Sequence, residues 1–152
     1  MEVSVFGIGY VGCVTIGCLS ESGHNVIGID KDSEKVELVS KGKATIIEKD
    51  ISELIERNHS LGRIRATNDF HYAITNSEIS IIAVGTPLSK DGSLNLDFVF
   101  KVAEEIGISL SQKDQFHTIV IRSTVLPGTN KKVGKIVEKF SGKKMNEDFA
   151  II

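Results

Sequence analysis

The pattern of hydrophobic and polar residues predicts six strands that alternate with six helices. Short, nearly continuous apolar runs are typical of parallel strands buried on both faces, whereas apolar residues repeated every three to four positions are typical of helices. We expect strands at about 2–6, 25–30, 64–67, 79–84, 117–122 and 149–152. We expect helices at about 10–21, 33–42, 50–58, 70–76, 96–110 and 130–140. This alternation predicts an α/β fold, a doubly wound parallel sheet with right-handed crossovers and helices on both faces.

The first predicted helix carries a stripe at helical spacing, which we expect to face the sheet. The stripe consists of Val11, Val14, Thr15, Cys18 and Leu19. Asp32 or Ser33 is expected to cap the second helix. The segment 45–48, which follows that helix, is expected to be an extended connection.

Three glycines lie between the first strand and the first helix, at Gly7, Gly9 and Gly12. Glycines at this spacing permit a tight turn, let a pyrophosphate approach the backbone and let the helix pack closely on the strand. Asp30 ends the next strand, where its carboxylate can accept hydrogen bonds from both ribose hydroxyls. A glycine turn without a ligand is the alternative, but the surrounding strands, helix and acid favour a Rossmann-like dinucleotide site.

The expected cofactor is NAD, because a carboxylate at Asp30 would repel the additional phosphate of NADP. Lys31 and Lys35 lie near this carboxylate in the sequence and work against that repulsion.

Composition excludes several other classes of protein. The 152 residues are enough for one domain, and a hydrophobic content of 41% is enough to build its core. Eighteen basic and 20 acidic residues give a net charge of −2, which offers no electrostatic basis for binding nucleic acid or an anionic membrane. No apolar run reaches membrane-spanning length, and no signal peptide is apparent. We therefore expect a cytoplasmic protein.

The cysteines and histidines do not predict a metal site or a disulfide. Cys13 and Cys18 lie five positions apart in one predicted helix and point to different sides of it, so they cannot readily pair. Cys13 is either a reactive thiol near the helix N-terminus or an inert buried residue, and the latter is favoured. The four histidines show no metal-ligand spacing.

Two further loops are expected to converge on the glycine turn, because ligands of doubly wound sheets bind beyond the carboxyl ends of the strands. The first contains Gly85, which lets the backbone approach a ligand, and the hydroxyl of Thr86. The second contains Ser123 and Thr124. These hydroxyls could instead be ordinary turn and cap residues, but their predicted convergence favours a functional role.

At these positions the chain resembles a known family. The similar motifs are Gly7-Ile8-Gly9-Tyr10-Val11-Gly12, Val84-Gly85-Thr86-Pro87 and Ser123-Thr124-Val125-Leu126-Pro127-Gly128-Thr129. In this order and spacing they resemble the N-terminal NAD-binding domain of the nucleotide-sugar 6-dehydrogenases, which form the UDP-glucose/GDP-mannose dehydrogenase family. Segments 17–20, 122–129 and 141–144 look most similar to the GDP-mannose branch.

The resemblance implies a reaction and a set of site residues. The family oxidises a primary alcohol of a nucleotide sugar to a carboxylate with two NAD⁺, through aldehyde, thiohemiacetal and thioester stages. Its cofactor contacts correspond here to Tyr10, Val11, Lys35, Thr86 and Thr124, in addition to the acid of the second strand. Thr124 also corresponds to a threonine that helps to orient a catalytic water. The substrate is either GDP-mannose or UDP-glucose, and the full-length enzyme is expected to be a homodimer or larger.

The chain also departs from the family pattern. The prolines and the glycine that usually flank the glutamate of the connection are missing from 45–50. The family's Asn-Pro-Glu-Phe-Leu segment and nucleophilic cysteine would follow residue 152, and Cys13 and Cys18 match neither. We therefore expect 1–152 to be the NAD-binding domain of a longer enzyme, without its central helical and C-terminal sugar-binding domains, and inactive alone.

Two readings from other classes remain. A non-catalytic nucleotide-sensing domain would share the glycine turn but has no evident need for Thr86 or for 123–129. A methyltransferase with a related sheet fits the early glycine loop and Asp30 less well.

Overall fold

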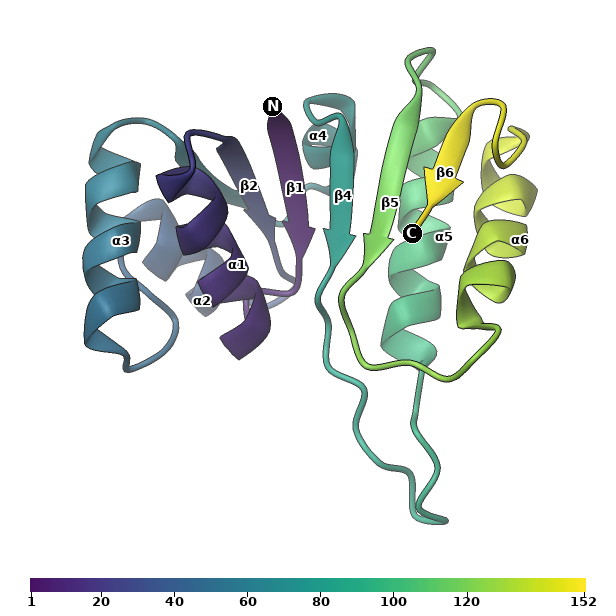
Figure 1. Cartoon of the computed structure of the whole chain (residues 1–152), viewed down its shortest axis with the longest axis horizontal. Helices are drawn as coiled ribbons and strands as arrows, with labels where there is room; N and C mark the ends of the chain where they lie inside the picture. The colour runs from purple at the N-terminus through teal and green to yellow at the C-terminus, as the bar shows by residue number, and fades with distance from the viewer.

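The computed structural model describes all residues from 1 to 152 and contains one six-stranded sheet. All strand pairs are parallel, in the order β3-β2-β1-β4-β5-β6. Figure 1 shows the strand arrows pointing in one direction, so that the loops after the strands gather at one edge of the sheet, called here the carboxyl edge. The strands are β1 (Glu2–Phe6), β2 (Asn25–Ile29), β3 (Ile64–Thr67), β4 (Ile79–Ile82), β5 (His117–Ile121) and β6 (Phe149–Ile151).

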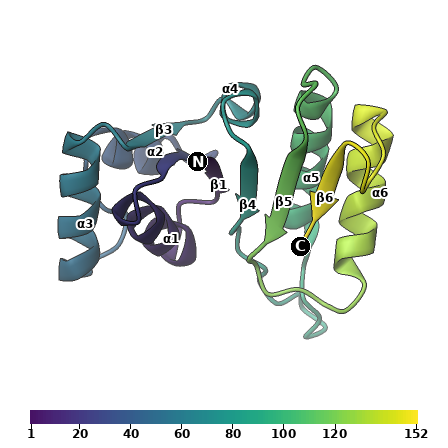
Figure 2. The same cartoon turned by 45° about the horizontal axis from the view of Figure 1, so that its top comes forward.

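Helices connect the strands on both sides of the sheet. They are α1 (Tyr10–Glu21), α2 (Ser33–Ser40), α3 (Lys49–Ser60), α4 (Phe70–Thr75), α5 (Asp97–Leu110) and α6 (Thr129–Ser141). Figure 2 shows α1, α2 and α3 grouped beside β1 to β3, with α5 and α6 beside β5 and β6. The predicted Rossmann-like α/β fold is confirmed, and each predicted element is present with its ends shifted by at most a few residues.

Successive strand residues supply two separate cores, because side chains along a strand alternate between the faces of the sheet. Val3 and Val5 of β1 pack in a cluster with residues of α1, α2 and α3. Phe6 belongs to the other cluster, with residues of α4, α5 and α6. Burial of apolar surface on both faces is what stabilises the sheet.

The predicted inward stripe of α1 is wrong except at Leu19, which packs against the core cluster beside α1. Val11 is 41% exposed and Cys18 is also exposed, whereas Val14, Thr15 and Leu19 are only partly buried. The buried face instead consists of Gly12, Cys13, Ile16, Gly17 and Ser20. Because α1 packs closely, the short side chains face inward and the hydrophobic pattern misleads.

The segment 45–48 contains neither helix nor strand, but the chain bends at Thr45 and Ile46, so it is not extended throughout as predicted. Asp32 caps α2 as predicted, since its carboxylate accepts a hydrogen bond from the Glu34 amide at 3.0 Å. None of the helices combines the length and the apolarity that a membrane span requires.

Candidate functional site

The loop between β1 and α1 is built by two glycines that no other residue could replace without strain. Gly7 has φ of 97°, a left-handed conformation that side chains disfavour, and its amide donates to the Ile29 carbonyl at 2.7 Å. A Cβ atom on Gly12 would lie 1.7 Å from the Gly7 carbonyl oxygen. The expectation that Gly12 permits close packing is therefore confirmed.

The N-terminus of α1 presents free backbone amides at the carboxyl edge. Gly9 is the N-cap residue and contributes no side-chain cap, and the first turn contains no acidic residue. Nothing lies within 4 Å of the position that a Cβ atom would occupy on Gly9. Tyr10 and Val11, in the first turn, are 60% and 41% exposed. Unpaired amides at the positive end of the helix dipole can hold an anionic phosphate group without a basic side chain.

The carboxylate of Asp30 is fixed beside this loop. Its Oδ2 atom accepts a hydrogen bond from the Ile8 amide at 2.8 Å, and its Oδ1 atom accepts one from the Asp32 amide at 3.0 Å. Lys35 Nζ lies 3.9 Å from Oδ2. Because a carboxylate oxygen can accept about two hydrogen bonds, each oxygen of Asp30 can still accept another. Two adjacent hydroxyl groups of a ligand match this capacity.

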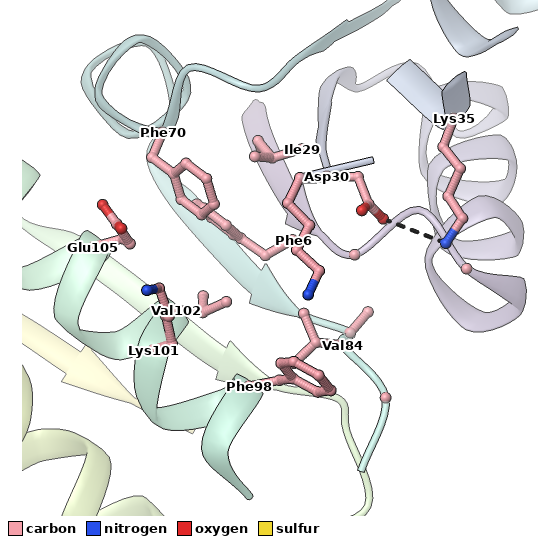
Figure 3. A pocket seen from close by; sticks show the side chains of 15 residues that line it. Phe6, Ile29, Asp30, Lys35, Phe70, Val84, Phe98, Lys101, Val102 and Glu105 are labelled. Carbon is pink, nitrogen blue, oxygen red and sulfur yellow. Dashed lines mark ion pairs between the residues drawn. The ribbon is translucent and has the colours of Figure 1, made fainter. Parts of the chain in front are cut away.

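A cavity of about 610 Å³ opens beside Asp30, a size typical of ligand sites. Figure 3 shows the labelled side chains around it, with the Lys35–Asp30 ion pair at one side. The cavity brings together five of the predicted site residues, Gly7, Gly9, Asp30, Lys35 and Gly85. Its other lining residues are Phe6, Ile29, Lys31, Phe70, Ala83, Val84, Phe98, Lys101, Val102 and Glu105.

Sequence reasoning missed the wall of the cavity that α5 provides. Phe98, Lys101, Val102 and Glu105 follow helical spacing and share one face of α5. Phe98 also meets the opposite side of the cavity, since Lys31 Nζ lies 4.5 Å from the centre of its ring. The rest of this helix is patterned for core packing. The mixture of aromatic, cationic and anionic residues on one of its faces could have indicated in the sequence that this face lines a ligand site.

Thr86 and Thr124 lie at the carboxyl edge but outside the cavity. Thr86 is half-buried in the loop after β4, and Thr124 is exposed in the loop after β5. Ser123 links the two loops, because its hydroxyl donates to the Val84 carbonyl at 2.6 Å. The two loops therefore meet each other through Ser123, but only the loop after β4, with Val84 and Gly85, lines the cavity beside the glycine turn.

The connection at 45–48 is attached to the glycine loop although it lacks the family's prolines. Thr45 donates from Oγ1 to the Ile8 carbonyl at 2.8 Å. The Tyr10 hydroxyl donates to Glu48 Oε1 at 3.3 Å. These two contacts hold the connection beside the N-terminus of α1.

The cysteines lie at different depths of α1 and are not bonded to each other. Cys13 is fully buried in the core cluster of that face, whereas Cys18 is exposed. Burial of Cys13 agrees with the favoured interpretation of an inert packing residue.

A second polar cluster lies near the amino ends of β1, β4 and β5, away from the cavity. We call it the amino-edge network, and it comprises Ser4, Ser77, Ser80, Lys113 and His117, all buried. Lys113 donates from Nζ to the carbonyl of Ile74 at 2.9 Å, to the carbonyl of Ser77 and to His117 Nδ1 at 3.0 Å. All three ammonium hydrogens therefore have acceptors.

The directions of the remaining hydrogen bonds in this network follow from Lys113. Because an ammonium group only donates, Nδ1 of His117 accepts, and Nε2 of the neutral ring donates to Ser80 Oγ at 2.7 Å. The Ser80 hydroxyl donates to Ser4 Oγ at 2.8 Å, Ser77 donates to the same oxygen at 3.0 Å, and Ser4 donates to the Ile79 carbonyl at 3.2 Å. Every polar side-chain atom buried here has a partner.

Burial and the nearby ammonium hold His117 neutral. Loss of solvation, together with the Lys113 charge, lowers the pKa of His117 from 6.5 to about 3. Burial also lowers the pKa of Lys113, while the charge of Glu78 opposes that effect. The network is thus a fixed structural feature at neutral pH.

Comparison with known proteins identifies relatives over the full chain. Residues 1–152 match the model of the UDP-glucose/GDP-mannose dehydrogenase family, NAD binding domain. The chain is 45% identical to a GDP-mannose 6-dehydrogenase of Pseudomonas aeruginosa and 37% identical to a UDP-glucose 6-dehydrogenase of Haloferax volcanii. Each alignment covers 99% of this chain and 35% of the relative, so the chain spans about a third of their length.

Solved structures of similar proteins share the fold closely. The crystal structure of a ternary complex of GDP-mannose dehydrogenase from Pseudomonas aeruginosa superposes with a TM-score of 0.97 at 45% identity, over 99% of this chain and 35% of that one. A UDP-glucose dehydrogenase from Pyrobaculum islandicum gives a TM-score of 0.92 at 33% identity, over 98% and 34%. The six parallel strands and their helices therefore occur in dehydrogenases of this kind.

Proposed function

The chain belongs to the UDP-glucose/GDP-mannose dehydrogenase family, as its NAD-binding domain, and we propose that it binds NAD in the cavity at the carboxyl edge. In the whole protein, the bound cofactor serves the oxidation of a nucleotide sugar at its primary alcohol. GDP-mannose is the favoured substrate and UDP-glucose the alternative, in line with the names of the relatives.

One observation carries this proposal: Gly9, the N-cap residue of α1, and the fixed carboxylate of Asp30 line the same cavity. The amides near Gly9, Tyr10 and Val11 would bind the pyrophosphate. Asp30 would accept hydrogen bonds from the ribose hydroxyls, and Lys35 would hold that carboxylate in place. Because two backbone amides already fix Asp30, it cannot easily turn away from a 2′-phosphate, which favours NAD over NADP.

The nicotinamide, when bound, supplies the two-electron oxidation. Thr86 and Thr124, on the loops after β4 and β5, are proposed to contact the cofactor beyond the cavity, and Thr124 is proposed to orient a water for proton transfer. Ser123 supports both loops through its hydrogen bond to Val84. No residue of this chain is proposed as the nucleophile, because Cys13 is buried in a core and Cys18 faces away from the sheet. The catalytic cysteine is proposed to lie elsewhere in the longer protein.

The proposal extends to the whole protein. A nucleotide sugar is its expected substrate, the cytoplasm its expected location and a homodimer or larger assembly its expected state. Nucleic acid and membranes are not expected partners, in keeping with the net charge of −2.

Titration calorimetry with NAD tests the cofactor assignment. Asp30→Ala is expected to weaken NAD binding by about 1–3 kcal/mol, since it removes the acceptor of two ribose hydroxyls. Asp114→Ala, at an exposed position on the opposite edge, is the matched control and should bind like the unchanged protein. Equal affinities of the two variants would contradict the assignment of Asp30.

Turnover assays test whether this domain binds the cofactor without catalysing the reaction. The isolated domain is expected to bind NAD⁺ and to form no NADH with GDP-mannose or UDP-glucose. Sustained NADH formation would show that the chemistry resides in this chain. Tighter binding of ADP or AMP than of NAD would instead support a nucleotide-sensing domain.

A further inference from the structure

One face of α5 lines the cavity. Phe98 lies in the first turn of the helix, Lys101 and Val102 one turn later and Glu105 a further turn on. Seven residues of helix advance about 10 Å, so Glu105 is well separated from Phe98 along the cavity. This face can therefore contact a ligand group at some distance from the glycine loop.

The two carboxylates of the cavity lie at opposite ends of it. Figure 3 shows Asp30 beside Lys35 on one side and Glu105 beside Lys101 on the other, with Phe6 and Phe70 between them. The rings of Phe6 and Phe70 are 5.6 Å apart at an angle of 36°. A ligand whose ribose meets Asp30 would extend its base past these rings towards Glu105.

Glu105 differs from Asp30 in having no partner. The carboxylate of Asp30 accepts two backbone amides and faces Lys35. Glu105 is half-buried, yet its carboxylate has no hydrogen bond within the chain, and none of the four ion pairs includes it. Although Lys101 lies one helical turn away, it forms no ion pair with Glu105. Its carboxylate is therefore available to accept a hydrogen bond from a ligand.

We propose that Glu105 is a specificity-determining residue of the cofactor site, which selects adenine by accepting a hydrogen bond from its exocyclic amino group. This inference rests on the proposed binding of NAD with its ribose at Asp30. Phe70, which is only partly buried, accommodates a flat face of the base, whereas Phe6 and Val102 belong to the buried core against which Phe70 packs. Glu105 then contacts the edge at which purines differ.

The selection follows from what a carboxylate can do. An ionised carboxylate only accepts hydrogen bonds. Adenine offers an amino donor at its six position, whereas hypoxanthine offers a carbonyl acceptor there, which Glu105 would repel. A polar group that a bound ligand removes from water discriminates against the analogue that leaves it unpaired.

The test compares NAD with nicotinamide hypoxanthine dinucleotide, which differs at this purine position, by titration calorimetry. The unchanged domain is expected to bind NAD about tenfold or more tightly than the analogue, the ratio expected for one hydrogen bond to a charged group. Glu105→Gln is expected to bring the two affinities within about threefold, because a carboxamide can donate to the carbonyl or accept from the amino group. Glu104→Gln, at the exposed neighbouring position of α5, should keep the original ratio.

Each outcome has a defined meaning. If the domain binds NAD but the ratio is near one, or if Glu105→Gln keeps the original ratio, the role of Glu105 is refuted while cofactor binding stands. If Lys101→Met rather than Glu105→Gln abolishes the preference, selection belongs to the lysine and the proposal is overturned. If neither dinucleotide binds, the proposed function itself fails. Thermal unfolding of each variant verifies that it is folded.

Discussion

The two edges of the sheet are both rich in polar groups, but they differ in how far those groups are already paired. At the carboxyl edge, the amides that begin α1 have no cap, and the oxygens of Asp30 and Glu105 can still accept hydrogen bonds. At the amino edge, Lys113 uses all three ammonium hydrogens on acceptors within the chain. Polar groups at the carboxyl edge can still form hydrogen bonds with a ligand, whereas those of the amino-edge network are already paired within the chain.

The difference separates binding from stability. Unpaired polar groups beside a cavity remain solvated until a ligand replaces the water. Their desolvation therefore contributes little to the free energy of folding. Buried groups must be paired within the protein, because an unsatisfied polar group in the interior is strongly unfavourable. Changes at the carboxyl edge that leave the backbone intact should therefore alter affinity, while changes in the amino-edge network should alter stability.

The largest expected effect on stability comes from a substitution at the carboxyl edge that disturbs the backbone, and it should lower both stability and affinity. Gly12→Ala places a Cβ atom where only 1.7 Å separates it from the Gly7 carbonyl oxygen. Because the contact is with backbone rather than a flexible side chain, α1 must move, and we expect a loss of roughly 3 kcal/mol or more in the free energy of unfolding. Urea-induced unfolding followed by circular dichroism measures this change, and NAD binding should be lost with it.

Gly9→Ala is the matched control for this substitution. Its φ of −79° suits alanine, and nothing lies within 4 Å of the new Cβ atom. Stability should change by less than about 1 kcal/mol, whereas NAD binding should weaken because the methyl group occupies the approach to the amides. Equal losses of stability in the two variants would disprove the distinction between these glycines.

The next effect concerns the amino-edge network. Lys113→Met leaves the carbonyls of Ile74 and Ser77 and Nδ1 of His117 without their donor. Relief from burying an ammonium group offsets part of this penalty, and we expect a net loss of about 2–3 kcal/mol in the free energy of unfolding. NAD affinity should stay unchanged in the folded variant. Lys131→Met, at an exposed position of α6, should leave the stability unaltered.

The network also makes stability depend on acid. Folding lowers the pKa of His117 from 6.5 to about 3. At a pH below 6.5, protons therefore bind His117 more readily in the unfolded chain than in the folded one. The stabilisation is complete above the unfolded pKa and is lost as the pH falls towards the folded value. At about pH 5 this one group should reduce the free energy of unfolding by about 2 kcal/mol relative to neutral pH.

Urea unfolding at neutral pH and at about pH 5 measures this acid dependence. His117→Gln has no titratable ring, so its loss of stability on acidification should be smaller than that of the unchanged protein by about the same 2 kcal/mol. An identical pH dependence of both proteins would show that His117 does not titrate as the structure implies.

The contrast between the edges also explains what the sequence could predict. The β1 strand, the glycine turn and Asp30 lie within 30 residues of one another, and their roles follow from local geometry. The wall of the cavity on α5 was missed because Glu105 meets the site only through the fold. Lys113 gave no signal at all, since lysine is ordinarily exposed and its partner Ile74 lies 39 residues away.

The error in α1 has a different physical cause. Periodicity assumes that larger apolar side chains face the core. Here α1 approaches the glycine loop so closely that Gly12 and Cys13 occupy its inner face, and Val11 is left exposed. A helix that packs through small residues reverses the usual pattern, and only the backbone separation reveals it.

The smallest expected effect is a coupling energy between two side chains, which double-mutant cycles can measure at both edges. A double-mutant cycle with Lys31→Ala and Phe98→Ala isolates the cation–π contact across the cavity, in which Nζ lies 4.5 Å from the ring centre. Both side chains are exposed, so the coupling energy in urea unfolding should be only about 0.5 kcal/mol. The corresponding cycle with Lys113→Met and His117→Gln addresses a buried hydrogen bond of 3.0 Å and should give a larger coupling, of about 1–2 kcal/mol. A coupling across the cavity as large as that in the network would mean that the carboxyl edge is already held closed without a ligand, contrary to the distinction drawn between the two edges.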